Sequence, residues 1–122
     1  MSATTIENAR IESTSISNAD HGVLTAWVHL NGSGWGCGFG GYRLDSHNKA
    51  LDRSLGTAWG LMFLMRVMET VGVSKWEDLP GKYVRVRTQG LGGGIAAIGH
   101  LIEDKWFEPK TDELLKKLEV LS

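Results

Sequence analysis

The chain has 122 residues, of which 42% are hydrophobic and 22% are charged, and its formal net charge at pH 7 is −1. This length suits one core, so we expect residues 1–122 to form a single domain. The composition excludes a disordered chain, and the near-neutral charge argues against binding to duplex DNA or to an anionic membrane.

Cysteine and histidine are too sparse for two common kinds of site. The only cysteine is Cys37, which excludes an internal disulfide framework, and no pair among it and the four histidines has zinc-ligand spacing. We therefore expect neither a metal nor a cofactor. Residues 1–5 lack the apolar core of a signal peptide, and no run approaches the ~18 apolar residues that span a bilayer. The expected location is the cytoplasm.

The first part of the chain predicts three antiparallel strands. Residues 5–16 alternate loosely, and residues 18–22 have the composition of a turn. Residues 23–30 are rich in β-branched and aromatic side chains, which predicts a strand. Asn31-Gly32 then predicts the turn of a hairpin, and residues 35–42 form its second arm.

In this second arm, glycine alternates with large or reactive side chains. Trp35, Cys37 and Phe39 fall on one face, and the opposite face is bare backbone. Glycine in a strand indicates the close approach of a ligand or another chain, or else a bulge packed tightly on a neighbouring strand. Both interpretations stay open.

Residues 45–49 have the composition of a polar loop, and residues 52–71 carry the longest regular pattern in the chain. This pattern predicts a helix that ends at Gly72. Apolar side chains cover nearly all of its circumference, so the helix should be buried on most sides. In so small a domain, that favours a helix between the sheet and a second subunit over a helix crossed only by its own sheet. We therefore expect a homo-oligomer.

The remaining segments complete an α+β pattern. Ser74 and Glu77 have capping-box spacing for a short helical turn, and residues 82–88 alternate as a strand. Residues 89–94 predict a flexible connection, and residues 95–102 a further strand. After Pro109, leucines at helical spacing predict an amphipathic tail. The predicted fold is α+β, with antiparallel β-hairpins packed on one long buried helix and a short C-terminal helix.

Two glycine-rich segments are candidates for phosphate binding. Gly36, Gly38 and Gly41 satisfy G-x-G-x-x-G, but they lie within a hairpin rather than before a helix, which argues against a dinucleotide fold. Residues 56–60 fall early in the predicted helix. Their small side chains and the Thr57 hydroxyl suit an anion site, although close packing of a strand explains them better.

Tyr83, Arg85 and Arg87 share one face of a predicted strand. Arginine pairs with phosphate and stacks on planar bases, and a solvated strand face is the equally weighted alternative. Catalytic groups are not assembled, because Asp20-His21 has no nucleophile nearby and Cys37 has no assignable histidine partner. The residues alone indicate a small oligomeric protein that binds a ligand, such as a nucleotide, without transforming it.

Several blocks occur in order between Ile6 and Pro109. They are Ile6-Glu7-Asn8-Ala9-Arg10-Ile11-Glu12-Ser13-Thr14, Asp20-His21-Gly22-Val23-Leu24-Thr25-Ala26, Gly38-Phe39-Gly40-Gly41-Tyr42, Gly56-Thr57-Ala58, Trp76-Glu77-Asp78-Leu79-Pro80-Gly81-Lys82, Val84-Arg85-Val86-Arg87, Ala97-Ile98-Gly99-His100 and Trp106-Phe107. Together they closely resemble the first-described family of phage Thoeris anti-defense proteins. The match covers residues 5–109, and the tail at 110–122 lies outside it.

The resemblance implies a sponge that acts in the cytoplasm of the host bacterial cell. Similar proteins sequester the cyclic ADP-ribose isomers that TIR-domain enzymes make, without cleaving them, so that the defence effector is not activated. They form dimers that assemble into hexamers, and some hold cyclic trinucleotides of CBASS defence at separate sites. The alternatives are a phosphodiesterase-type enzyme that hydrolyses the same signals, and a structural or protein-binding phage component.

The chemistry of the matching blocks suggests a ligand site and no catalytic residue. Aromatic rings suit stacking on a base, guanidinium groups suit the pyrophosphate, and short polar side chains suit ribose hydroxyls. The candidates are Phe39, Tyr42 and Phe63 for stacking, Arg66, Arg85 and Arg87 for phosphate, and Thr57 and Asp20 for ribose.

Overall fold

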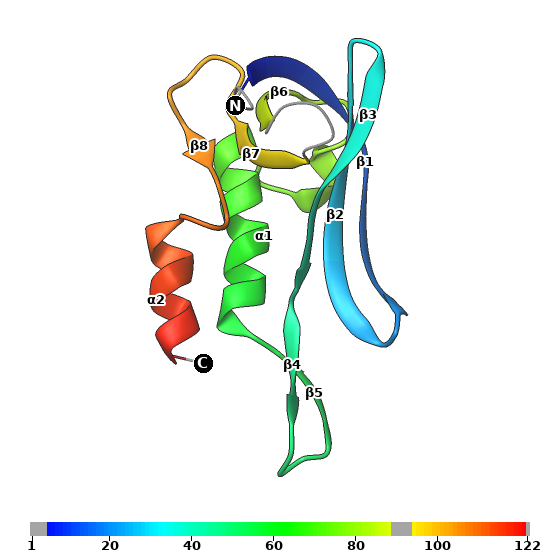
Figure 1. Cartoon of the computed structure of the whole chain (residues 1–122), viewed down its shortest axis with the longest axis vertical. Coiled ribbons are helices and arrows are strands. Elements are labelled where there is room, and N and C mark those ends of the chain that lie inside the picture. Colours follow the sequence, from blue (N-terminus) through cyan, green and yellow to red (C-terminus); the bar gives the residue numbers. More distant parts are fainter. Residues whose placement is uncertain (1–4, 89–93, 122) are drawn as a thin grey trace.

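The computed structural model describes residues 5–88 and 94–121 of the chain. Two α-helices and eight strands follow one another, with one short 3-10 helix, η1, before β6 (Figure 1). Their bounds are β1 Thr5–Asp20, β2 Val23–Gly32, β3 Trp35–Arg43, β4 Asp45–Asn48, β5 Arg53–Gly56, α1 Ala58–Val71, η1 Trp76–Asp78, β6 Tyr83–Thr88, β7 Ile95–Gly99, β8 Trp106–Phe107 and α2 Glu113–Leu121. The predicted α+β class and its antiparallel sheet are confirmed.

The main sheet has six strands in the order β3-β2-β1-β6-β7-β8, and every pairing is antiparallel. The long strand β1 joins its two halves, because its first part pairs with β6 and its second part with β2. The sheet curves until its edge strands meet through their side chains. The rings of Phe39 in β3 and Phe107 in β8 have centroids 6.3 Å apart.

Helix α1 lies against the inner face of this curved sheet, and α2 packs beside α1 (Figure 1). Phe63 of α1 is fully buried and touches both Phe39 and Phe107, with ring centroids 6.1 and 5.6 Å away. Apolar residues of β1, β2, β6 and β7 complete the core, which comprises chiefly Ala9, Ile11, Ala26, Val28, Leu30, Val67, Val84, Val86 and Ile98.

The glycine-alternating strand proves to be a bulged strand packed on its neighbour. The register between β2 and β3 shifts beside Trp27, and Gly40 and Gly41 have φ values of +114° and +77°. Those backbone conformations favour glycine. The Trp27 indole lies over Gly38 and Gly41, so a side chain of this same chain covers the bare backbone.

The predicted start of α1 is wrong by six residues. Thr57 is the N-cap, and residues 45–56 form a separate two-stranded hairpin, β4–β5, that projects from the body (Figure 1). The Asn48 side chain accepts a hydrogen bond from the Leu51 backbone and Asp52 adopts a φ of 50°, which closes the hairpin turn. The predicted helix end is confirmed, because Gly72 is left-handed and donates its N–H to the Met68 carbonyl.

The prediction that α1 is buried on most sides is also wrong. Leu61 is 62% exposed and Met65 is 39% exposed, so one stripe of the helix faces solvent in this chain. The capping-box prediction fails as well, since η1 begins after Lys75 without a side-chain cap. The predicted strand 95–102 ends at Gly99, and most of the predicted connection 89–94 lies outside the described residues.

The C-terminal helix occurs where the leucine spacing predicts it. Asp112 precedes it, and its carboxylate accepts a hydrogen bond from the Leu115 backbone N–H, in the manner of an N-cap. Leu115 is 1% exposed and anchors the helix in the core. Within the described ranges, neither helix has the length and apolar character required to cross a bilayer.

Candidate functional site

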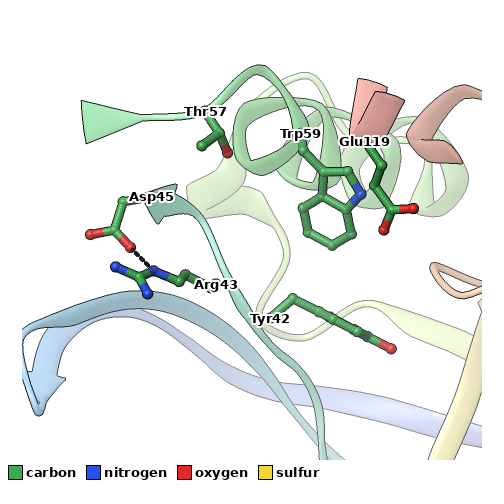
Figure 2. A pocket seen from close by; sticks show the side chains of 6 residues that line it. All are labelled: Tyr42, Arg43, Asp45, Thr57, Trp59 and Glu119. Carbon is green, nitrogen blue, oxygen red and sulfur yellow. Dashed lines mark hydrogen bonds and ion pairs between the residues drawn. The ribbon is translucent and has the colours of Figure 1, made fainter. Parts of the chain in front are cut away.

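Tyr42, near the end of β3, stands between two hollows. The first encloses about 270 Å³ and is lined by Tyr42, Arg43, Asp45, Thr57, Trp59 and Glu119 (Figure 2). The second encloses about 380 Å³ and is lined by Tyr42, Gly94, Ile95, Ala96, Glu108, Lys110 and Thr111. Because one ring lines both, a ligand lying across Tyr42 would contact both hollows.

Trp59, in the first turn of α1, forms an aromatic wall of the first hollow. Its ring stacks on Phe63 at an interplanar angle of 8° and is tilted against Tyr42, with the Trp59 and Tyr42 centroids 5.6 Å apart. The buried indole nitrogen of Trp59 has no hydrogen-bond partner in the described part of the chain. A buried N–H without an acceptor destabilises a protein by about 1–3 kcal/mol. Trp59 therefore carries an unpaired donor that lies buried, and a ligand in the hollow reaches it only by moving the side chains that cover it.

An ion pair forms the opposite side of the first hollow. The Arg43 Nε donates to Asp45 Oδ1 at 2.9 Å, and Asp45 is 7% exposed while the Arg43 side chain is about half exposed. Figure 2 shows Arg43 across the hollow from the Trp59 ring. The guanidinium thus compensates a buried carboxylate and also brings positive charge to the mouth of the hollow.

Thr57 has a structural task in the same hollow. Its hydroxyl donates to the Leu44 carbonyl at 3.0 Å and accepts from the Gly60 N–H at 2.9 Å. Gly60 is pressed against the Leu44 backbone, where an added Cβ would overlap it. Gly60 therefore allows close packing of the Leu44 backbone between β3 and β4, as the alternative interpretation predicted, whereas Gly56 has open space around it. The Thr57 hydroxyl proton is already used, which leaves little for the predicted ribose contact.

The surroundings of Tyr42 favour the protonated form of its hydroxyl. Burial raises the pKa of its hydroxyl above the usual value of 10.0, and the nearby negative charge of Glu108 raises it further. At neutral pH the group is therefore a hydrogen-bond donor rather than a base. This suits binding to an acceptor, such as a phosphate or carbonyl oxygen.

Arg85 and Arg87 lie on one face of β6, here called the arginine face, and both contact the ring of Trp106. Arg85 and Arg87 both place their guanidinium carbons over the Trp106 ring, 4.8 and 4.6 Å from its centroid. Trp106 in turn lies over Gly99, which leaves room for the ring. Cation–π contacts of this kind hold guanidinium groups in place.

The two arginines differ in how fully they are engaged. Arg85 donates to the carbonyls of His100 at 2.7 Å and Glu103 at 2.8 Å, which ties the β7–β8 loop to β6. Arg87 has a long ion pair with Glu108, at 3.6 Å, besides its contact with Trp106, and its side chain is 32% exposed. Glu108 lines the second hollow, so this ion pair connects Arg87 to a residue of that lining.

Arg66 lies on α1, away from Tyr42. Its guanidinium pairs with Asp112 at 3.3 Å and Glu69 at 3.1 Å and lies over the Phe107 ring. It borders a third hollow of about 450 Å³, lined by Arg66, Glu69, Thr70, Asp104, Lys105 and Trp106. Because Asp112 also caps α2, Arg66 connects the two helices.

The remaining candidates fall elsewhere. Phe39 and Phe63 are 2% and 0% exposed, so their rings pack on each other and on Phe107 instead of facing a ligand. Asp20 ends β1 beside the turn, and its side chain lies outside the described ones. Of the predicted residues, the structure therefore brings Tyr42 and Thr57 to one hollow and Arg85 and Arg87 to one strand face.

The sequence analysis did not single out Trp59, Trp106, Glu108 or Glu119. Trp106 belongs to one of the sequence blocks that carry the family resemblance, and its place in that block was the signal that could have identified it. Among the described residues, no three His, Cys, Asp or Glu side chains come together as a possible metal site. His100 accepts backbone N–H bonds from Ile102 and Glu103, which is a structural role.

Comparisons of this chain with protein-family models, with curated proteins and with solved structures found no match.

Proposed function

We propose that this protein binds and sequesters a cyclic nucleotide immune signal, of the cyclic ADP-ribose class made by TIR-domain enzymes, without degrading it. Its action in the host bacterial cytoplasm would inhibit anti-phage defence. The resemblance of residues 5–109 to phage Thoeris anti-defense proteins motivates this choice of ligand. The geometry supports it independently through the hollow at Tyr42.

One observation carries the proposal. The hollow in Figure 2 combines the rings of Tyr42 and Trp59 with the Arg43 guanidinium, and the unpaired indole N–H of Trp59 is buried beside it, where a ligand gains it as a donor by displacing the covering side chains. These are the groups needed for a purine base, a carbonyl or phosphate oxygen, and a negative charge. The carboxylates of Asp45 and Glu119 in the same lining are acceptors for ribose hydroxyls.

The second hollow supplies positive charge for the pyrophosphate of the ligand. Lys110 lines it, and Arg87 reaches it through Glu108. A pyrophosphate lying past Tyr42 would compete with Glu108 for Arg87, and the protonated Tyr42 hydroxyl would donate to it. Binding by stacking, pairing and hydrogen bonds holds a signal without breaking a bond, and slow release then follows from the number of contacts.

We also propose that the protein is a homodimer that assembles further, to a hexamer as the resemblance implies, and that cyclic trinucleotides bind at separate sites. The exposed stripe of α1, with Leu61 and Met65, and the exposed Leu114 of α2 support an interface between copies. The projecting hairpin β4–β5 adds support, because an isolated two-stranded hairpin is only marginally stable in water.

A thermal-shift measurement tests ligand binding. A TIR-derived cyclic ADP-ribose at about 100-fold its dissociation constant stabilises a protein that binds it by about 2.7 kcal/mol. In a domain of this size that corresponds to a rise in Tm of several degrees. AMP and linear ADP-ribose serve as controls and should have smaller effects. An unchanged Tm with every cyclic isomer would favour the structural or protein-binding alternative.

A further inference from the structure

The outer face of strands β1, β2 and β3 shares Arg43 with the lining of the first hollow, and its other residues lie outside the three linings given above. The strand register shows which residues lie on this face. Ala26, Val28 and Leu30 of β2 point into the core, so the residues that alternate with them point outward. The residues on this face are Arg10, Ser13, Ser15 and Ser17 of β1, Thr25, Trp27, His29 and Asn31 of β2, and Gly36, Gly38, Gly41 and Arg43 of β3, because the bulge turns Gly40 toward Phe63.

Trp27 is laid flat on this face by the glycines of β3. A Cβ at Gly38 would lie 2.8 Å from Trp27 Cε3 at one edge of the six-membered ring. A Cβ at Gly41 would overlap the opposite edge of that ring, at Cζ2 and Cη2. Both glycines therefore seat the indole against the backbone. The side chain is nonetheless 39% exposed, so the opposite face of the ring is turned to solvent.

His29 extends the flat surface. Its ring lies 6.5 Å from that of Trp27 at an interplanar angle of only 17°. Ser15 pairs with Trp27 and Ser13 with His29 across β1, and both serines are exposed. An aromatic floor is thus bordered by a row of hydroxyls, which both donate and accept hydrogen bonds.

The charges on this face indicate the class of ligand. Arg10 pairs with Glu12 at 2.7 Å, and Arg43, which pairs with Asp45 at 2.9 Å, also lines the first hollow, so neither arginine is an unpaired cation beside Trp27 and His29. A nucleic acid needs cations for its phosphates as well as rings for its bases. A neutral molecule with an apolar face and hydroxyl edges needs only what this face presents.

We propose that the Trp27 face is a binding site for a neutral oligosaccharide. The C–H face of a pyranose ring stacks on Trp27, and a neighbouring sugar lies over His29. Sugar hydroxyls exchange hydrogen bonds with Ser13, Ser15 and Asn31 along the two sides. This site also gives a function to the glycine alternation of β3, which the Tyr42 hollow does not use.

The test follows the indole N–H resonances of the full-length protein by NMR, in titrations with cellopentaose, maltopentaose and chitopentaose in turn. The expected result is a saturable shift confined to Trp27 with at least one sugar. Trp27→Ala lacks this reporter resonance, so its affinity is measured by isothermal titration calorimetry beside the wild type, and it should be weaker about tenfold or more. Gly38→Ala should weaken it by tilting the ring, whereas Gly56→Ala, where an added Cβ meets nothing within 4 Å, should not.

Three outcomes would overturn the proposal. They are no shift at Trp27 with any of the sugars at millimolar concentration, equal binding by Trp27→Ala, or a stronger response of Trp27 to oligo-dT than to sugar. The last result would assign the face to single-stranded nucleic acid. The resonances of the other tryptophans report whether each variant is folded.

Discussion

Trp59 and Tyr42 lie with their ring centroids 5.6 Å apart, and the Trp59 indole nitrogen is buried without an acceptor in the described chain. The pair belongs to two elements, α1 and β3, that meet only through tertiary packing. Figure 2 shows this nitrogen on the side of the ring near Glu119, so the stacking surface and the unpaired donor belong to different sides of Trp59.

Replacement of Trp59 tests that donor. Trp59→Phe keeps an aromatic ring against Phe63 but removes the unpaired N–H, so the free energy of unfolding without ligand should fall by less than about 1 kcal/mol or rise slightly. Affinity for the cyclic nucleotide should fall about tenfold, because one hydrogen bond is lost. Urea denaturation and calorimetric titration measure the two quantities. Unchanged affinity would remove the indole N–H from the site.

Arg87 tests the arginine face. Arg87→Ala removes the cation over Trp106 and the long pair with Glu108, and it should weaken ligand binding while the oligomer stays intact. The loss expected for one charged contact is about tenfold or more. Arg53→Ala, on the exposed hairpin, is the matched control and should bind normally. Equal affinity of the two variants would show that the arginine face does not contact the ligand.

Gly60 tests the close packing that positions the hollow. Ala is normally better than Gly in a helix by about 1 kcal/mol, but a Cβ at Gly60 would overlap the Leu44 backbone. We expect Gly60→Ala to lower the free energy of unfolding by about 2 kcal/mol. Gly56→Ala, with open space around it, should change little. Chemical denaturation decides, and a stabilised Gly60→Ala protein would contradict this account of the packing.

Leu61 tests the interface between copies. Leu61→Glu places a charge on the exposed stripe of α1 and should shift the protein toward monomer in light scattering or analytical ultracentrifugation. Because Leu61 is 62% exposed in the single chain, the fold itself should tolerate the change. Ile16→Glu, at an exposed apolar position on β1, is the control. A wild-type protein that is monomeric at high concentration would refute the interface directly.

Tyr42 predicts a pH dependence at the alkaline end. Its raised pKa means that the folded state holds the phenol proton more tightly than the unfolded state, whose value is about 10. The contribution to stability is therefore complete below about pH 10 and is lost as pH rises through the folded-state pKa. Tyr42→Phe should show a smaller loss of stability across that window. Parallel alkaline profiles of the two proteins would contradict the prediction.

Local signals were sufficient for much of the fold. The hairpin of β2 and β3, the left-handed Gly72 and the leucine spacing of the tail each depend on a few adjacent residues, and each was predicted. The turn of that hairpin was misplaced, because Ser33 and Gly34 form it while Asn31 and Gly32 lie in β2. The hairpin β4–β5 was not, because its strands hold few β-branched residues. Asp52 and Ser54 also resemble helix caps as much as Thr57 does, so the helix start was placed too early.

The site was less predictable than the fold. Tyr42 was found because it ends a distinctive strand, and Arg85 and Arg87 because their alternation is local. Trp59 was missed because its contact with Tyr42 depends on α1 packing against β3. Phe39 and Phe63 were assigned to stacking on a ligand because the sequence does not distinguish an aromatic residue of the core from one that lines a pocket. The curvature of the sheet, which buries both rings in the core, is a tertiary feature.

Sequestration without chemistry is the central claim, and recovery of the bound ligand tests it most directly. The purified protein is incubated with a TIR-derived cyclic ADP-ribose, separated from unbound ligand and heat-denatured, and the released nucleotide is identified by mass and chromatography. The account predicts the intact cyclic molecule in an amount comparable to the protein. Release of a linear product would make the protein an enzyme, and recovery of no nucleotide would contradict binding altogether.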